Sequence, residues 1–179
     1  MIPEILSYND KFVAEERYKP FITSKYPDKK IAIVTCMDTR LVELLPAALG
    51  IKNGDVKMIK NAGGVIDSPF DSTMRSLLVA VYELGVTEIM IIGHTECGVQ
   101  GMQAKEMIHL MEHRGISPDT IELIRRCGID LDKWLDGFEE TPNAVKDSVE
   151  LVRNHPLLPG DVNVSGYIMD SVTGKLSPL

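Results

Sequence analysis

The chain has 179 residues, 44% of them hydrophobic and 25% charged, and its 26 acidic and 19 basic side chains give a formal net charge of −7. This composition is typical of one globular domain, and the acidic balance excludes a broadly basic surface for nucleic acid or anionic lipid. No stretch approaches the about 20 apolar residues of a membrane span, and residues 1–10 lack the order of a signal peptide, so we expect a cytoplasmic protein without a membrane partner.

The first predicted element is a charged helix over residues 9–19, which Pro20 ends or kinks. Its apolar stripe is only partial. A helix of this kind packs either on its own domain or on a partner subunit, and the sequence leaves both open. We therefore expect one domain over residues 1–179, with residues 1–29 as a helical arm and residues 30–179 as its core.

Apolar strands then alternate with amphipathic helices. Runs of β-branched and apolar residues predict buried strands over 30–35, 56–59 and 88–92. Apolar side chains at helical spacing predict helices over 41–49 and 74–84, each followed by a glycine. This alternation requires crossover connections, so it predicts an α/β fold with a mainly parallel central β-sheet flanked by helices.

The second half of the chain is predicted to be more helical. The expected elements are helices over 99–113, 119–127, 131–138 and 141–154, a strand over 162–169, and a turn at 173–174. Thr141 precedes a proline, so we expect its hydroxyl to cap the last of these helices.

The cysteines and one histidine form the main candidate site. Three cysteines are too few, and odd in number, for a disulfide framework. Cys36 directly follows the first predicted strand, and His94 and Cys97 follow the third. Because the carboxyl ends of parallel strands meet at one edge of a sheet, we expect these three side chains to converge. Cys127 lies near no other candidate ligand in the sequence and is interpreted as structural or incidental.

Two thiols and an imidazole are ligands that zinc prefers in a tetrahedral shell. The spacing His94-x-x-Cys97 lets one turn supply two ligands, and the chain offers no second close pair of the kind that structural zinc sites use. Three protein ligands leave a fourth position for water, so the pattern predicts a catalytic zinc site. A thiol-bearing α/β domain without metal is the simplest alternative.

Asp38 and Arg40 follow Cys36 at intervals of two residues. Asp38 either caps the next helix or is clamped by Arg40 in a bidentate ion pair that keeps it ionised. An ionised aspartate beside zinc either accepts a hydrogen bond from metal-bound water or enters the metal shell as a fourth ligand and closes the site. The residues alone leave these alternatives open.

The combined motif Cys36-x-Asp38-x-Arg40 and His94-x-x-Cys97 resembles the signature of the β-class carbonic anhydrases. The resemblance implies Zn²⁺ bound by the two cysteines and the histidine, with Asp38 and Arg40 as the catalytic pair.

The likeness extends over residues 31–101, including Asn61-Ala62-Gly63-Gly64, and more loosely to residues 166–176. The short chain resembles the compact prokaryotic members most. The resemblance implies a homodimer or a dimer of dimers, with the helical arm against a neighbouring subunit. Gly63 and Gly64 are candidate substrate-binding residues, because glycine lets the backbone approach a small molecule; a plain turn is the alternative.

The activity that the resemblance implies is reversible hydration of CO2 to bicarbonate by attack of a zinc-bound hydroxide. Two thiolates cancel the charge of Zn²⁺, so this hydroxide should form at higher pH than on a zinc held by imidazoles, and we predict that kcat/KM rises above neutrality. The alternatives are a hydrolase of carbonyl sulfide (COS) or carbon disulfide (CS2) on the same scaffold, and a non-catalytic zinc-binding module. His109 and His113, one helical turn apart, are interpreted as solvent-facing.

Overall fold

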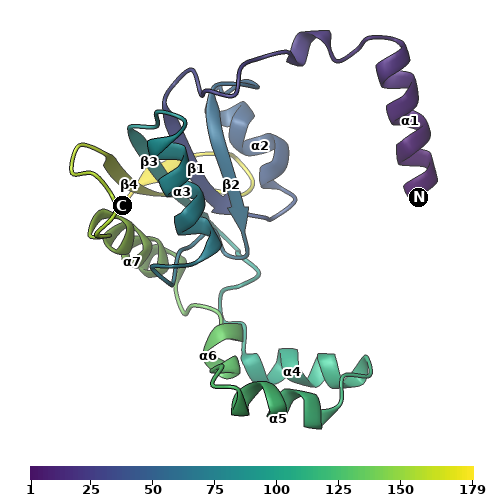
Figure 1. The fold of residues 1–179 in the computed structure, drawn as a ribbon, viewed down its shortest axis with the longest axis vertical. Helices are drawn as coiled ribbons and strands as arrows, with labels where there is room; N and C mark the ends of the chain where they lie inside the picture. Colours follow the sequence, from purple (N-terminus) through teal and green to yellow (C-terminus); the bar gives the residue numbers. More distant parts are fainter.

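A five-stranded β-sheet forms the centre of the computed structural model, which describes residues 1–179 (Figure 1). The strand order is β2-β1-β3-β4-β5. The strands are β1 (Ile31–Cys36), β2 (Val56–Asn61), β3 (Glu88–His94), β4 (Asn163–Met169) and β5 (Leu176–Pro178). The first four are parallel and β5 is antiparallel to β4, so the predicted α/β fold with a mainly parallel sheet is confirmed. The sequence analysis missed β5, because three residues are too few to show a periodicity.

Helices cover both faces of this sheet. They are α2 (Leu41–Ala48) on one face, and α3 (Ser72–Tyr82) and α7 (Thr141–Arg153) on the other. The remaining helices are α4 (Ala104–His113), α5 (Pro118–Arg126) and α6 (Leu131–Leu135). Apolar side chains of α3 and α7 pack with Val34 and Ile91 in one core cluster, whereas those of α2 pack with Ile33 and Ile92 in a second cluster. Alternate residues of β1 and β3 are therefore buried on opposite faces, which explains why these strands are continuous apolar runs.

Two parts of the chain project from this body (Figure 1). Helix α1 (Ile2–Ala14), followed by the short 3₁₀ helix η1 (Lys19–Phe21), has no buried residue. Helices α4, α5 and α6 pack around a small apolar cluster of their own. None of the helices is long and apolar enough to cross a membrane.

The bounds of several predicted helices were wrong. The arm helix starts at Ile2, where Pro3 occupies its first turn, and it is over before Glu16, whose backbone is left-handed with φ 52°. The helix expected from residue 99 begins only at Ala104, after turns that include Gly101 at φ 74°. The helix expected to reach residue 138 ends at Leu135, because the backbone of residues 137–138 pairs with residues 101–102 instead.

Thr141 does not cap α7. The N-cap is Glu140, and Thr141 is the first helical residue. Its buried hydroxyl donates instead to Gln100 Oε1 at 2.9 Å, so it joins the helix to the turn that follows Cys97.

The order of the strands places a topological switch point beside β1. The chain passes from β1 through α2 to β2, and then returns through α3 to β3 on the other side of β1. The connections at the carboxyl ends of β1 and β3 thus leave in opposite directions. Open α/β sheets generally bind their ligands at such a switch point, beyond the carboxyl ends of the two strands.

Candidate metal centre

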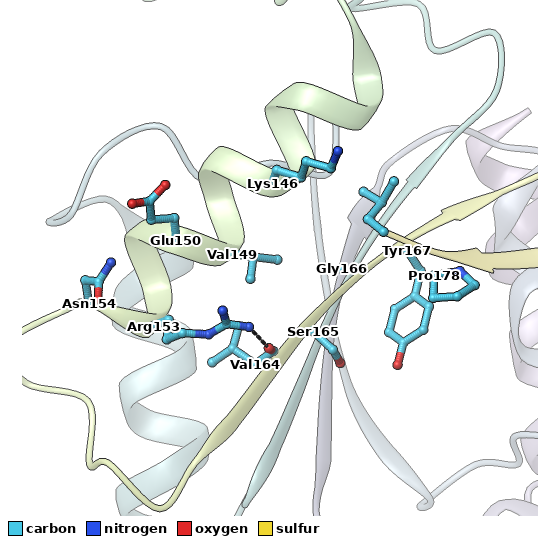
Figure 2. A pocket seen from close by; sticks show the side chains of 11 residues that line it. Lys146, Val149, Glu150, Arg153, Asn154, Val164, Ser165, Gly166, Tyr167 and Pro178 are labelled. Carbon is cyan, nitrogen blue, oxygen red and sulfur yellow. Dashed lines mark hydrogen bonds between the residues drawn. The ribbon is translucent and has the colours of Figure 1, made fainter.

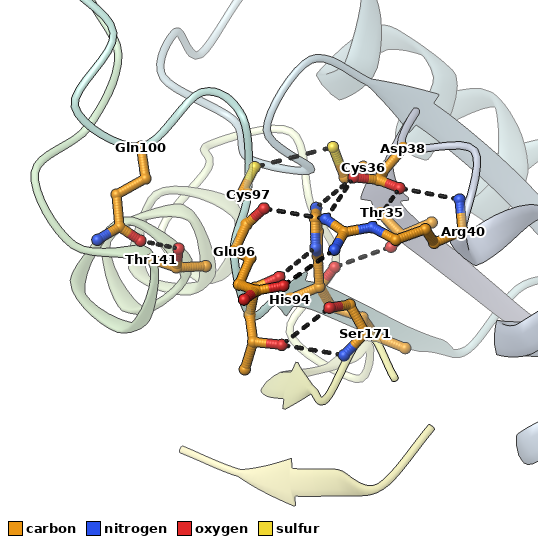
Figure 3. A network of polar contacts seen from close by, with 12 residues as sticks. Thr35, Cys36, Asp38, Arg40, His94, Glu96, Cys97, Gln100, Thr141 and Ser171 are labelled. Carbon is orange, nitrogen blue, oxygen red and sulfur yellow. Dashed lines mark hydrogen bonds and ion pairs between the residues drawn. The ribbon is translucent and has the colours of Figure 1, made fainter. Parts of the chain in front are cut away.

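Cys36, His94 and Cys97 come together at this switch point (Figure 3). Cys36 is the last residue of β1 and His94 the last of β3, and Cys97 lies in the turn beyond β3. Their ligand atoms all lie within 4.8 Å of one another, and all three residues are at most 5% exposed. The two Sγ atoms are 3.9 Å apart, close to the about 3.8 Å that two thiolates have around a tetrahedral zinc ion. The predicted convergence of these residues is therefore confirmed.

The imidazole of His94 is oriented as a metal ligand would be. Its Nδ1 donates to the carbonyl of Thr95 at 2.9 Å, which leaves the lone pair on Nε2. Nε2 is buried and has no hydrogen-bond partner. A buried polar atom without a partner is costly, and a metal ion between Nε2 and the two thiols would satisfy it. The donor set present here fits zinc.

The turn that carries these ligands is anchored to the end of β4. The Thr95 amide donates to the carbonyl of Met169 at 3.0 Å, and the Thr95 hydroxyl accepts from the Ser171 amide at 3.0 Å. Burial, together with the neighbouring Cys36 sulfur, raises the pKa of the Cys97 thiol. Without metal this thiol keeps its proton at neutral pH, so metal binding must release that proton.

Arg40 clamps Asp38 beside the cluster. Its guanidinium donates from Nε to Asp38 Oδ1 at 3.0 Å and from Nη2 to Oδ2 at 2.9 Å. This hydrogen-bonded ion pair lowers the pKa of Asp38 to about 2, and its partner's pKa rises. Of the two roles weighed for Asp38, the clamp is present. The only backbone amide that bonds the Asp38 side chain is that of Arg40, which is itself the N-cap residue of α2, so Asp38 does not cap this helix.

The Asp38 carboxylate lies beside the cluster of candidate ligands and makes no hydrogen bond to it. Its Oδ2 is 4.0 Å from Nε2 of His94. Both oxygens of the carboxylate accept hydrogen bonds from Arg40, so the carboxylate is turned to Arg40.

Glu96 is a residue of the site that sequence analysis missed. Arg40 donates from Nη1 to Glu96 Oε2 at 3.1 Å and from Nη2 to the Glu96 carbonyl at 2.9 Å (Figure 3). Its position between two ligands was the only signal in the sequence. The distant partner could not be identified without the fold.

Gly64 packs directly against the backbone of Cys36, and Gly63 faces the ring of Phe138. Both glycines have positive φ, 86° for Gly63 and 68° for Gly64. These contacts give both glycines a packing role, and their role in substrate binding stays a prediction. A cavity of about 930 Å³ lies next to them, lined in part by Asn61 and Phe138.

The other candidates lie elsewhere. His109 and His113 are exposed on α4, as expected, and their ring centroids are 4.1 Å apart. Cys127 is exposed at the end of α5 and lies outside the cluster. A second cavity, of about 560 Å³, lies between α7 and the strands β4 and β5 (Figure 2). Arg153 there donates to the carbonyl of Val164, and no histidine or cysteine lines the cavity.

Comparisons with known proteins agree on one family. A family model described as carbonic anhydrase matches residues 31–176. The Bacillus subtilis protein named "Putative carbonic anhydrase YvdA" is 48% identical over 98% of this chain and 89% of its own. A crystal structure of β-carbonic anhydrase isoform I from Trichomonas vaginalis superposes with a TM-score of 0.89 at 38% identity, over 99% of this chain and 96% of that one. A carbon disulfide hydrolase from Acidithiobacillus thiooxidans is 34% identical over 84% of this chain and 77% of its own.

Proposed function

The chain belongs to the β-class carbonic anhydrase family, and from this membership we propose that it catalyses the reversible hydration of CO2 to bicarbonate with a zinc ion. The ligands are Cys36, His94 and Cys97. The observation that carries the proposal is the buried, unpartnered Nε2 of His94, which faces two thiols at the spacing of zinc ligands. A zinc ion held there supplies Lewis acidity that lowers the pKa of water towards neutrality.

Asp38 and Arg40 act on the attacking water. The Asp38 carboxylate accepts a hydrogen bond from this water and so fixes its orientation towards the carbon of CO2. Arg40 keeps the carboxylate ionised, because its hydrogen bonds favour the charged form, and holds it away from the metal position. Val99 and Phe138 pack against the apolar cluster that contains both cysteines, and such a wall suits an apolar substrate.

A stopped-flow CO2 hydration assay across pH 6 to 9, with zinc content measured on the same sample, tests this proposal. We expect kcat/KM to rise above neutrality in the zinc-loaded protein, and the zinc-free protein to be inactive. A zinc-loaded protein with no hydration activity at pH 9 would refute the proposal. A flat profile would show that formation of the nucleophile does not control the rate.

Hydrolysis of CS2 or COS is a second candidate, because one relative is named a carbon disulfide hydrolase and is 34% identical. Both molecules are linear like CO2, so the same water, oriented by Asp38, is suited to attack their carbon atom. Parallel assays with CO2, COS and CS2 rank the three substrates by kcat/KM. A kcat/KM for CS2 above that for CO2 would replace hydration as the main activity.

A non-catalytic zinc module is the third possibility. It requires Asp38 as a permanent fourth ligand, whereas Asp38 is turned to Arg40. Crystals of the zinc-loaded protein grown at pH 7 and pH 9 distinguish the two. Asp38 bound to zinc at both pH values would favour the module.

We also propose that the protein is a homodimer, or a dimer of dimers, of single-domain chains. Helix α1 exposes Ile2, Ile5 and Leu6 by 60% or more. A helix of 13 residues without buried contacts is marginal in water, so packing on a second copy would stabilise it. Light scattering of the full chain and of a chain lacking residues 1–14 tests this, and an intact chain that is monomeric would refute it.

A further inference from the structure

The guanidinium of Arg40 is shared between two acidic residues. The Nε hydrogen and one hydrogen of Nη2 are donated to the Asp38 carboxylate, and one hydrogen of Nη1 is donated to the Glu96 carboxylate. The second hydrogen of Nη2 is directed to the Glu96 carbonyl. Four of the five N–H groups of Arg40 therefore donate a hydrogen bond, two to Asp38 and two to Glu96.

Glu96 links the two segments that carry the candidate ligands. Cys36 and Arg40 belong to the end of β1 and the start of α2, whereas Glu96 lies in the turn between His94 and Cys97. The side chain of Arg40 is 39% exposed, so without a second anchor it has room to rotate in solvent. The Glu96 carbonyl holds Nη2, and the Glu96 side chain, which is 75% exposed, adds a bond to Nη1. Together these bonds fix the plane of the guanidinium and keep its Nε edge on Asp38.

The backbone of Glu96 argues for a role of its side chain. Its φ is 55°, in the left-handed region that costs a non-glycine residue energy. Glycine would adopt this conformation without strain but would have no carboxylate. Compared with glycine, glutamate at this position therefore makes the backbone less stable, but it forms the ion pair with Arg40.

We propose that Glu96 is a positioning residue, which acts through Arg40 to keep the Asp38 carboxylate turned away from the metal position. This inference rests on the proposed function, since it concerns the state of the same site. Asp38 has no side-chain partner for its oxygens other than Arg40, and its Oδ2 is only 4.0 Å from Nε2 of His94. Loosening of Arg40 therefore frees the carboxylate to approach the cluster.

The test compares Glu96→Gln, which removes the charge and keeps the size, with Glu96→Gly, which also relieves the backbone. Asp132→Asn is the matched control, because Asp132 accepts two hydrogen bonds from Arg125, which is 40% exposed, away from the cluster. The first readout is NMR exchange of the Arg40 Nε proton in the zinc-free and zinc-loaded proteins. Its signal is identified by its loss in Arg40→Lys.

We expect this exchange to accelerate about two- to five-fold in both Glu96 variants, as for loss of an exposed ion pair, and to stay unchanged in Asp132→Asn. Glu96→Gly should show the faster exchange with an unchanged or higher melting temperature. A purely structural role would not produce that combination. Unchanged exchange in both Glu96 variants would overturn the inference.

The second readout is the pH profile of CO2 hydration. At pH 7 we expect kcat/KM of Glu96→Gln to fall about two- to five-fold, and to recover by pH 9, where hydroxide competes better with the Asp38 carboxylate. An equal loss at both pH values, or a loss of zinc, would overturn the inference in favour of a structural role. If the wild-type protein does not hydrate CO2, the proposed function fails, and the Nε exchange still decides the role of Glu96.

Discussion

Gly64 lies so close to Cys36 that a methyl group on its Cα would be 2.5 Å from the Cys36 backbone nitrogen. This contact fixes the end of β1, and with it the position of one candidate zinc ligand. Because backbone cannot yield as a flexible side chain can, even one added carbon must displace the segment that carries Cys36.

Gly64→Ala should therefore damage both stability and metal binding. We expect a loss of about 3 kcal/mol in the free energy of unfolding, from the clash and the left-handed backbone together, and a reduced zinc content. Gly50→Ala is the control, because Gly50 has a similar φ of 63° and nothing within 4 Å of an added methyl group. It should cost about 1 kcal/mol and retain zinc. Equal effects in urea titrations would contradict the importance of the Gly64 contact.

Removal of a thiol ligand should abolish zinc binding. Cys36→Ala is expected to lose the metal and the hydration activity, because two remaining ligands hold zinc poorly. Cys127→Ser should keep both, since Cys127 is exposed and outside the cluster. Metal analysis after gel filtration measures the zinc content. Full zinc in Cys36→Ala would show that the site is elsewhere.

Replacement of Arg40 should separate metal binding from activity. In Arg40→Ala, Asp38 loses the hydrogen bonds that lower its pKa, so this pKa rises from about 2 towards 3.8 and the carboxylate is free to move. We expect zinc to remain and kcat/KM at pH 7 to fall about 100-fold. Arg40→Lys should be only partly active, because the ammonium group of lysine cannot donate two parallel hydrogen bonds to the Asp38 carboxylate as the guanidinium does.

Arg125→Ala removes an arginine of similar exposure at α5 and should leave the activity unchanged. Loss of zinc from Arg40→Ala would point to a structural role of Arg40. Metal analysis and stopped-flow hydration assays on the same preparations distinguish the two results.

Asp170 should make the stability of the protein dependent on pH in the acid range. Its Oδ1 accepts hydrogen bonds from the amides of Val172 and Thr173 and from the Thr173 hydroxyl in the turn between β4 and β5. These bonds, the Thr173 amide foremost, lower the pKa of Asp170 below 3.8. The folded state thus binds its proton less tightly than the unfolded state. The resulting stabilisation is complete above about pH 5 and is lost as the pH falls below 4.

The difference in unfolding free energy between the wild type and Asp170→Asn should accordingly be largest near pH 6 and shrink towards pH 3. Urea titrations at each pH measure it. A difference that grows as the pH falls would have the wrong sign for a carboxylate stabilised in its charged form.

The convergence of Cys36, His94 and Cys97 could be predicted because it depends only on local patterns. Cys36 follows one short apolar run, and His94 and Cys97 follow another; the length and β-branched residues of both runs favour buried strands, and parallel strands bring their carboxyl ends to one edge. The helices 41–49 and 141–154 were predicted almost to the residue, since a glycine or a proline marks their ends. In contrast, α1 has no buried face, and so its apolar pattern carries no information on its bounds.

The sequence by itself determined the fold class and the three candidate ligands, because the alternation of strands and helices and the chemistry of the ligands are local properties. It left open whether Asp38 caps a helix or pairs with Arg40, and the structure shows the pair. Only the tertiary structure decided which lone pair of His94 faces the thiols, that Thr141 bonds Gln100 instead of capping its helix, and that Glu96 completes the hold on Arg40. These contacts join residues far apart in the chain. Whether such groups meet depends on how loops pack above the sheet, and no local pattern of side chains encodes that distance.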